Sequence, residues 1–258
     1  MDRIYRFRQG MGGRYAVERD GGLYWLEGHV FGDYHLGMLI EEKGLRVAPP
    51  VMPSKIMAIG LNYKDHAAEM NKKLPAEPLV FSKPATSVIG TDDPIQLPVW
   101  AGRIDHEAEM AVVIGRRARN VRAAQAMDYV LGITCLNDVT ARELQSKDVQ
   151  YTRAKGFDSF APIGPCIAVG LDASDLAIEG WVNGEKRQSS STNQLIFPVP
   201  ELVEFVSRFC TLEPGDIITT GTPSGVGPLA PGDRVMVKLA GVGTLSNPCV
   251  AATEAQTH

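Results

Sequence analysis

Short apolar stretches dominate the hydrophobic pattern of this chain. The clearest lie at residues 56–60, 79–81, 110–114 and 130–136, and each is bounded by polar or turn-forming residues. Stretches of this length with such flanks favour buried β-strands over helices. Strands outnumber helices, and their alternation is too irregular for a doubly wound sheet. The pattern therefore predicts an α+β fold that is mainly β.

Helical periodicity is confined to a few segments. Residues 121–129 and 140–147 have helical patterns, and residues 62–70 (NYKDHAAEM) predict a helical turn. Pro200 is expected to open one further helix. The apolar stripe of that helix consists of Leu202, Phe205, Val206 and Phe209. We expect these short helices at the periphery of the sheets.

Turn signals divide the chain into segments. The DGG sequence at 20–22 and the Asn-Gly pair at 183–184 are typical of β-hairpins. The prolines of APPVMPSK, residues 48–55, indicate a linker. We therefore expect a small β-rich N-terminal segment over residues 1–50 and the main domain over residues 51–258.

Composition narrows the possible functions. The 258 residues are 44% hydrophobic and 22% charged, as in ordinary soluble globular proteins. A net charge of −4 gives no basic surface for nucleic acid or an anionic membrane. No apolar run approaches the ~18 residues of a membrane span, and the first residues lack the apolar core of a signal peptide. The cysteines lie far apart without a C-x-x-C pair, which predicts core thiols and a cytoplasmic location.

Acidic residues are concentrated in IDHEAEMAVVIG, residues 104–115, just before an apolar strand. Side chains two positions apart share a strand face at roughly 6.5–7 Å, so Glu107 and Glu109 project together. Asp138 stands at the exit of another predicted strand and offers a third ligand. Ligands that are all oxygens favour a hard cation, Mg²⁺ first with Mn²⁺ or Ca²⁺ as alternatives, whereas zinc prefers nitrogen or sulfur.

Two plainer interpretations of these acids stay open. Paired glutamates often lie on a solvated strand edge, and an aspartate at Asp138 can cap a helix. Thr140 and Glu143, however, have the spacing of a capping box of their own, which leaves Asp138 free for a metal ion. We expect His106 to pack at the strand mouth rather than to bind the ion.

The DHAAE sequence at 65–69 places an imidazole beside a carboxylate. His66 and Glu69, three residues apart on a helical turn, share one face. A carboxylate neighbour raises the basicity of an imidazole and fixes its tautomer, as a general base requires, although such pairs are also common on surface helices. The Lys- and Pro-rich loop that follows is a candidate lid over a site.

Polar residues after Asp138 suit an anionic or carbonyl substrate. Arg142 and Gln145 share a helix face, and Lys155 is placed to stabilise a developing oxyanion, with surface solvation as the alternative for each. The small-residue loop at 220–227 (TGTPSGVG) could bind an anion through its amides or be a plain turn. It lacks the P-loop motif.

Together these motifs resemble the fumarylacetoacetate hydrolase family. The matching stretches run in the family's order: IGLNYKDHAAE (59–69), FSKPAT (81–86), DHEAEMAVVIG (105–115), LNDVTARELQ (136–145), TRAKGFDSFAPIGP (152–165) and GTPSGVG (221–227). The resemblance implies the family's mixed β-sandwich roll and a homodimer. Two departures concern the pocket: Tyr151 stands where tryptophan is frequent, and Gly156 where serine is frequent.

The resemblance also implies a role for each candidate residue. Glu107, Glu109 and Asp138 are implied to bind Mg²⁺ or Mn²⁺. His66 and Glu69 are implied to form a catalytic dyad, with Lys155 at the reacting oxygen. Arg142, Gln145 and Thr222 match positions that contact substrate.

Members of the family act on 2-oxo acids and 1,3-dicarbonyls, and the chain resembles bacterial acylpyruvases and 2-hydroxyhepta-2,4-diene-1,7-dioate isomerases. Because the dyad is intact, we expect hydrolysis of a carbon–carbon bond in an acylpyruvate-type substrate. The alternatives are isomerisation or decarboxylation of the dienoate, decarboxylation of oxaloacetate, and ureidoglycolate lyase activity. A metal-dependent binding module for 2-oxo acids is the non-enzymatic alternative.

Overall fold

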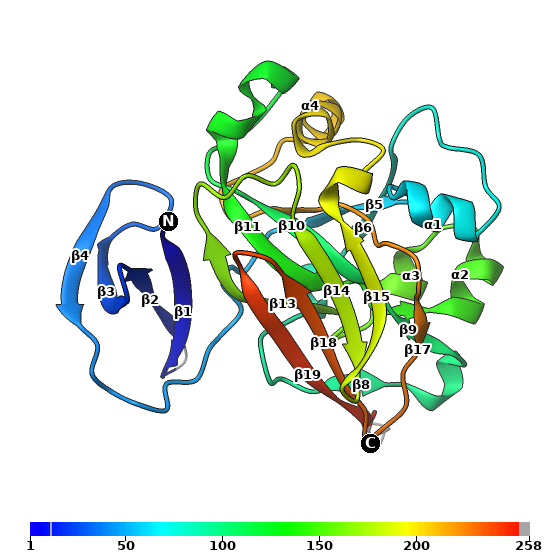
Figure 1. Ribbon diagram of the computed structural model, residues 1–258, viewed down its shortest axis with the longest axis horizontal. Coiled ribbons are helices and arrows are strands. Elements are labelled where there is room, and N and C mark those ends of the chain that lie inside the picture. Colours follow the sequence, from blue (N-terminus) through cyan, green and yellow to red (C-terminus); the bar gives the residue numbers. More distant parts are fainter. Residues whose placement is uncertain (11, 253–258) are drawn as a thin grey trace, which may run out of the picture.

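The computed structural model describes residues 1–10 and 12–252 of the chain. Its first strands form an antiparallel meander at one end of the molecule (Figure 1). The meander consists of β1 (Arg3–Gln9), β2 (Gly12–Arg19), β3 (Gly22–Gly28) and β4 (Tyr34–Leu39). Asp20 and Gly21 both have positive φ between β2 and β3, which is the backbone of a two-residue hairpin turn. The predicted β-rich segment and its hairpin are confirmed.

The meander continues into a long sheet. β1 pairs antiparallel with β13 (Ala161–Ala168), with Ile4 opposite Ile167. Beyond β13 the strand order is β11 (Val130–Asn137), β10 (Ala108–Ile114), β16 (Ile217–Thr219), β5 (Ile56–Gly60) and β6 (Leu79–Lys83), and β7 (Val88–Ile89) pairs separately with β13. The N-terminal segment is therefore hydrogen-bonded to the rest of the chain, and the domain division at residue 50 stays a prediction.

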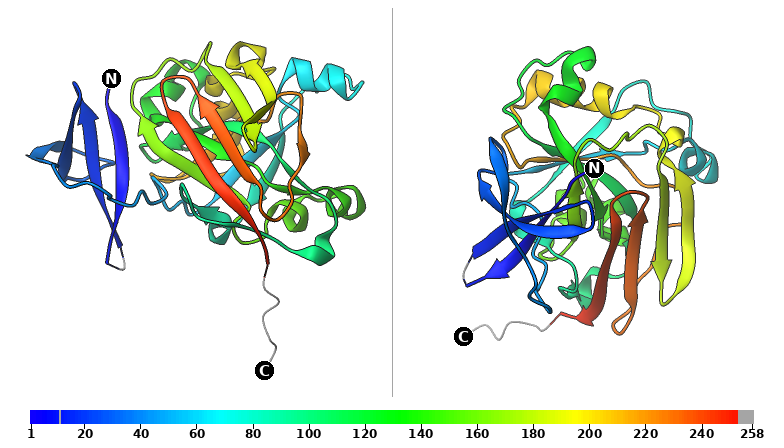
Figure 2. Two further views of the ribbon diagram at one scale, coloured as in Figure 1. Left: turned by 60° about the horizontal axis from the view of Figure 1, so that its bottom comes forward. Right: turned by 60° about the vertical axis from the view of Figure 1, so that its left-hand side comes forward.

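A second sheet packs across the part of the long sheet around β10 and β11. Its strand order is β15 (Glu185–Ser191), β14 (Ala177–Val182), β18 (Arg234–Leu239), β19 (Gly243–Ala251) and β8 (Ile95–Leu97). Met110 and Val112 of β10 share one core cluster with Val237 and Leu245 of this sheet. A small third sheet of β12 (Thr140–Ala141), β9 (Ile104–His106) and β17 (Gly227–Pro228) completes the sandwich. Figure 2 shows the layers from two further sides.

From Met110 to Ile114, strand β10 is apolar because both of its faces are buried. Met110 and Val112 point into the core between the sheets, whereas Ala111 and Val113 point into a second core with Ile4 of the meander. Successive side chains of a strand alternate between faces, so a strand covered on both sides needs an unbroken apolar run. The two buried layers hold the acidic end of β10 in a fixed position.

The helices are short and peripheral. The α-helices are α1 (Lys64–Glu69), α2 (Arg142–Asp148), α3 (Thr152–Lys155) and α4 (Val199–Phe209), and the 3₁₀ helices are η1 (Ala85–Ser87), η2 (Val99–Ala101), η3 (Ala123–Tyr129) and η4 (Thr192–Gln194). Figures 1 and 2 place α1, α2 and α3 at the end of the molecule away from the meander. None of the described helices is long and apolar enough to cross a membrane.

The helical segment predicted over residues 121–129 is a 3₁₀ helix over Ala123–Tyr129. Two other local predictions are wrong. In α4, Val203 is buried while Phe209 is 55% exposed, so the buried stripe is shifted from the predicted one. Thr140 makes no capping box with Glu143, because it pairs with Asp105 in the small sheet and its hydroxyl donates to the Asp138 carbonyl at 2.8 Å.

The cysteines and the proline-rich linker both contribute to the core. Cys135, Cys166 and Cys249 are buried free thiols, which confirms the prediction for these three, and Cys210 is half-buried. The linker has no regular structure, yet its residues 48–51 are buried against the meander and the long sheet.

Candidate metal and substrate site

The three predicted metal ligands meet where β9 and β11 end and β10 begins. Ala108 of β10 lies opposite Asn137 of β11, so Glu107 and Asp138 flank the same point of the sheet. The Asp138 amide donates to the Glu107 carbonyl at 2.8 Å. Glu107, Glu109 and Asp138 are all buried, and one oxygen from each lies within 4.8 Å of the others. The structure thus brings together the three acids that the sequence singled out.

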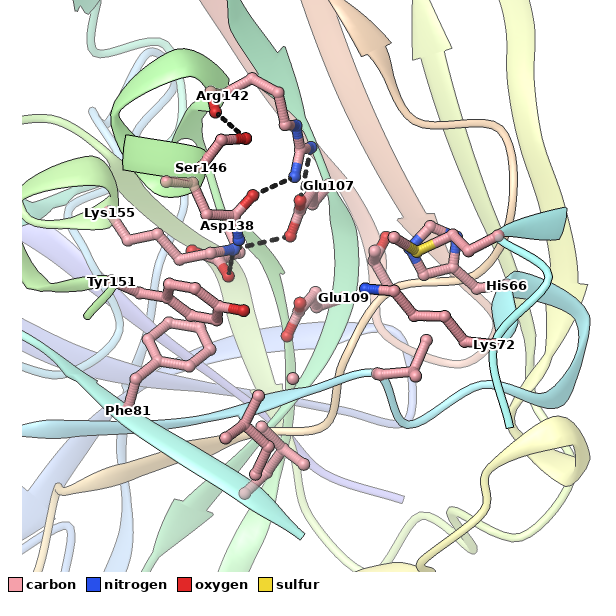
Figure 3. Close-up of a pocket in the computed structure, with 17 residues that line it drawn as sticks. His66, Lys72, Phe81, Glu107, Glu109, Asp138, Arg142, Ser146, Tyr151 and Lys155 are labelled. Carbon is pink, nitrogen blue, oxygen red and sulfur yellow. Dashed lines mark hydrogen bonds and ion pairs between the residues drawn. The ribbon is translucent and has the colours of Figure 1, made fainter. Parts of the chain in front are cut away.

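Basic side chains surround two of these acids (Figure 3). Lys155 Nζ donates to Glu107 Oε2 at 2.8 Å and also contacts Asp138. Arg142 Nη2 donates to Glu107 Oε1 at 2.7 Å. On the other side, the fully buried Lys83 donates to Asp138 Oδ1 at 2.6 Å. These cations offset much of the repulsion that packed carboxylates would otherwise suffer.

Lys83 was not predicted from the sequence. It lies two positions after Phe81 on β6, so the two side chains share a strand face, and Phe81 lines the cavity. That spacing is the one sequence signal for its position, but it does not reveal burial. Burial lowers the pKa of Lys83 even though Asp138 favours its charge. For Lys155, burial acts in the same direction but the Asp138 and Glu107 carboxylates outweigh it and raise the pKa.

The two glutamates differ in their electrostatic surroundings. Burial disfavours the Glu107 carboxylate, but Lys155 and Arg142 outweigh this effect and lower its pKa to about 2. Burial raises the pKa of Glu109 well above its usual range, and the neighbouring Asp138 raises it further. The Gly221 amide donates to Glu109 at 3.0 Å. Among the described residues, no basic side chain forms a salt bridge with Glu109, so the cluster has room for a further positive charge. Three carboxylates offer only oxygen ligands, which suits a divalent cation.

The predicted dyad is also formed. His66 Nδ1 lies 2.9 Å from Glu69 Oε2 on α1. The Gly225 amide donates to Glu69 Oε1 at 3.1 Å, and Ser190 Oγ donates to Asp65 Oδ2 at 2.5 Å. These contacts hold α1 against the second sheet and the loop before β17. His66 lines the same cavity as the three acids.

Backbone amides of the loop at residues 220–227 donate hydrogen bonds to carboxylates of the protein itself. Gly221 has φ of +88° and Gly225 has φ of +92°, and their amides bind Glu109 and Glu69. The sequence left open an anion-binding loop or a plain turn. These two amides bind side-chain carboxylates of the site and so connect the metal cluster with the dyad.

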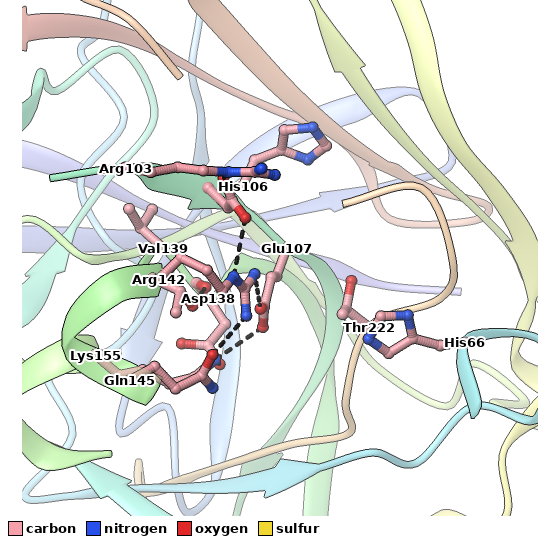
Figure 4. Close-up of polar contacts among 12 residues, drawn as sticks. His66, Arg103, His106, Glu107, Asp138, Val139, Arg142, Gln145, Lys155 and Thr222 are labelled. Carbon is pink, nitrogen blue, oxygen red and sulfur yellow. Dashed lines mark hydrogen bonds and ion pairs between the residues drawn. The ribbon is translucent and has the colours of Figure 1, made fainter. Parts of the chain in front are cut away.

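Arg142 and Gln145 lie next to each other at the cavity wall (Figure 4). Arg142 Nη1 donates to Gln145 Oε1 at 2.6 Å, and Arg142 Nε donates to Asp105 Oδ2 at 2.9 Å. Thr222 also lines the cavity, but its hydroxyl donates to the Ala108 carbonyl at 2.9 Å and accepts from Gln188 Nε2 at 2.8 Å. Their contacts with substrate stay predictions.

Gln188 is a further residue that was not predicted from the sequence. It is buried, and its Oε1 accepts from the Ala108 amide at 2.9 Å and lies 3.1 Å from His106 Nδ1. Gln188 therefore fixes the backbone between the two glutamates together with Thr222. His106 packs at the strand mouth, as predicted, and burial lowers its pKa. No motif in the sequence marks Gln188.

The three acids, His66 and Lys155 border one cavity of about 410 Å³. Every predicted site residue lines it except Glu69, which contacts His66 from outside. The apolar wall is formed by Ile59, Leu61, Met70, Leu79 and Phe81. Tyr151, which stands where tryptophan is frequent in the family, also lines the cavity and packs edge-on against Phe81 with ring centroids 5.4 Å apart.

The family model for the fumarylacetoacetate (FAA) hydrolase C-terminal domain matches residues 55–250. The chain belongs to the fumarylacetoacetate hydrolase family. Its fold agrees with the crystal structure of 2-hydroxyhepta-2,4-diene-1,7-dioate isomerase from Mycobacterium marinum, at 39% identity and a TM-score of 0.90, with 98% of this chain and 100% of that chain covered. This family fold confirms the predicted mixed β-sandwich.

Two further relatives of this family member are named for different reactions. The mitochondrial oxaloacetate tautomerase fahd2 of Xenopus laevis is 42% identical over 216 residues, which are 79% of this chain and 68% of the relative. Maleylpyruvate hydrolase from Sphingobium sp. SYK-6, solved with manganese(II) and pyruvate, is 28% identical with a TM-score of 0.81 over 97% of this chain and 100% of that chain. Membership in this family thus supports an enzymatic function and a divalent metal. It does not select one reaction, because these relatives are named for several.

Proposed function

We propose that this family member is a metal-dependent enzyme that hydrolyses a carbon–carbon bond in acylpyruvate-type 2-oxo acids. The observation that carries the proposal is that His66, held by Glu69, lines the same cavity as Glu107, Glu109 and Asp138. Hydrolysis needs both a stabilised enolate and a base that activates water. A protein that only binds a 2-oxo acid has no use for a base beside its ligand cavity.

Glu107, Glu109 and Asp138 would hold the cation, which we propose to be Mg²⁺ or Mn²⁺. The manganese in the maleylpyruvate hydrolase relative supports this assignment. A bound divalent cation supplies a Lewis acid that stabilises negative charge on the oxygens of a 2-oxo acid.

The remaining chemistry belongs to side chains of this chain. We assign His66 as the base that takes a proton from water, with Glu69 holding the imidazole in one orientation at 2.9 Å. Lys155 keeps its positive charge between Glu107 and Asp138 and would stabilise a developing oxyanion. Arg142 and Gln145 would orient a substrate carboxylate or carbonyl.

Keto–enol tautomerisation of oxaloacetate is the second candidate. The oxaloacetate tautomerase relative is 42% identical, whereas the maleylpyruvate hydrolase relative is 28% identical. Tautomerisation needs only proton transfer next to a carbonyl, so the same dyad and cation would serve. Isomerisation or decarboxylation of the dienoate, decarboxylation of oxaloacetate and cleavage of ureidoglycolate are further candidate reactions.

A substrate panel tests the proposal. The Mg²⁺- or Mn²⁺-loaded protein is assayed with acetylpyruvate, fumarylpyruvate, oxaloacetate, ureidoglycolate and the seven-carbon dienoate. We expect cleavage of the acylpyruvates, loss of activity after exhaustive chelation and recovery when the metal is returned. Turnover of oxaloacetate alone would favour the tautomerase, and full activity without metal would contradict both candidates. The homodimer and the cytoplasmic location expected from the sequence stay predictions.

A further inference from the structure

Lys72 lines the cavity, yet neither the metal cluster nor the dyad uses it. It follows α1 in the Lys- and Pro-rich loop, and Figure 3 shows its side chain extending towards the cavity. Within residues 1–10 and 12–252, its ammonium makes no hydrogen bond or salt bridge. A cation at the edge of a cavity without a protein counter-ion is available to bind an anionic group of a ligand.

A defined turn places this lysine. The Lys72 amide donates to the Ala67 carbonyl at 2.9 Å, and the Asn71 amide donates to the Ala68 carbonyl at 3.1 Å. Asn71 adopts φ of +55°, a left-handed conformation that asparagine tolerates. These bonds form the Schellman motif that ends a helix, so α1 fixes the backbone of Lys72. Since Asp65 and Glu69 hold α1, the lysine is positioned by the same contacts as the dyad.

The other strong cations of the cavity are already paired. Lys155 contacts Glu107 and Asp138, and Arg142 contacts Glu107. Figure 3 shows these two on one side of the acidic cluster and Lys72, with His66, on the other. A ligand that carries its 2-oxo acid group at the cluster and a second carboxylate at its far end would therefore place that carboxylate near Lys72.

We infer that Lys72 is a specificity-determining residue that binds the distal carboxylate of a dicarboxylate 2-oxo acid. The inference rests on the proposed function, because it takes the 2-oxo acid group to lie at the acidic cluster. A lysine ammonium offers three donors on a flexible stem and suits a carboxylate whose distance varies between substrates. Lys73 follows it directly and is exposed as Lys72 is, but only Lys72 lines the cavity.

Binding of two matched ligands tests the role of Lys72. The ligands are 2-oxoglutarate and 2-oxopentanoate, which have equal chain length but end in a carboxylate and a methyl group. Neither is a 1,3-dicarbonyl, so binding to the Mn²⁺-loaded protein can be measured by calorimetry without cleavage. We expect the wild type to prefer 2-oxoglutarate by about 10- to 100-fold, the value of one charge-assisted hydrogen bond. Lys72→Met should abolish the preference, and Lys73→Met should keep it.

The outcomes separate this inference from the proposed function. Equal binding of the two ligands by the wild type, or a preference that survives in Lys72→Met, would overturn the role of Lys72 alone. If Mn²⁺ binds but neither 2-oxo acid does, the proposed function fails and the inference fails with it. As a second readout, Lys72→Met should raise KM for fumarylpyruvate much more than KM for acetylpyruvate, and Mn²⁺ affinity should not change.

Discussion

Lys83 and Asp138 form a fully buried ion pair, with Lys83 Nζ donating to Asp138 Oδ1 at 2.6 Å. Lys155 contacts the other oxygen of Asp138. The carboxylate nearest the end of β11 is thus held between two lysines that come from different parts of the chain. This pairing makes the acidic cluster part of the folded core as well as of the candidate metal site.

Removal of Lys83 should destabilise the fold. In Lys83→Met, Asp138 keeps only one of its two cationic partners, and breaking a buried pair by removing one partner typically costs about 3–5 kcal/mol. We expect the free energy of unfolding in urea to fall by about 3 kcal/mol. The double variant Lys83→Met/Asp138→Asn should recover part of the loss, because the uncompensated carboxylate is gone. A single variant as stable as the wild type would show that the pair contributes nothing.

Replacement of Glu109 should abolish tight metal binding. Glu109→Gln keeps the shape of the side chain but removes one of three anionic ligands, so we expect Mn²⁺ affinity to fall by at least about 100-fold. Calorimetry measures this directly. Glu185→Gln, on the exposed face of β15, is the matched control and should bind Mn²⁺ like the wild type. Unchanged affinity in Glu109→Gln would remove this residue from the metal site.

Metal binding should depend on pH through Glu109. Because its pKa is raised well above the usual range, the cation has to displace a proton to bind this carboxylate. Affinity for Mn²⁺ should therefore fall as the pH falls, and binding should release a proton. Titrations in two buffers of different ionisation enthalpy measure the number of protons released. Identical heats in both buffers would contradict the raised pKa.

Loss of the dyad should slow catalysis but leave metal binding intact. His66→Gln removes the proposed base without adding a charge, and we expect kcat for acylpyruvate cleavage to fall by about 100- to 10,000-fold. His35 makes a similar contact with Glu27, but on the exposed surface of the meander, so His35→Gln is a matched control. Native cleavage rates in His66→Gln would reject the assignment, whereas retained tautomerisation with lost cleavage would separate the two candidate reactions.

Val149 is strained, and a glycine should relieve the strain. It has φ of +60° and ψ of −43° between α2 and α3, and the Gln150 amide donates to the Asp148 carbonyl across it at 2.5 Å. This is the rare γ-turn that β-branched residues disfavour most. The Val149 side chain is 85% exposed, so Val149→Gly loses little packing and should raise the free energy of unfolding by about 1 kcal/mol.

Val149→Ala is the control for this turn. It removes the branched side chain but keeps a Cβ atom at positive φ, so it should stabilise less than glycine does. If Val149→Gly is less stable than the wild type in urea titrations, the turn is not strained.

The sequence determined the features that depend on neighbours along the chain. Glu107, just before β10, and Glu109 within it lie together because side chains two residues apart in an extended chain point the same way. His66 and Glu69 meet because a helix brings residues three apart onto one face. The DGG hairpin follows from the positive φ that glycine permits. These are local geometries, so their residue spacing predicts them. The place of Asp138 at the end of a strand follows in the same way.

Tertiary structure decided the contacts between distant segments. Lys83 lies 55 positions from Asp138, and Gln188 lies 80 positions from the Ala108 amide that it binds, so no spacing rule connects them. The predicted capping box does not form for the same reason: Thr140 pairs with Asp105, a residue distant in sequence, and so belongs to a strand. A single helix cap stabilises a protein by about 1 kcal/mol, whereas burial of both faces of a strand such as β10 stabilises it by several times more. Tertiary packing therefore prevails where it disagrees with a local preference. Only the folded chain could therefore reveal which cations offset the buried acids and which lysine extends towards the cavity.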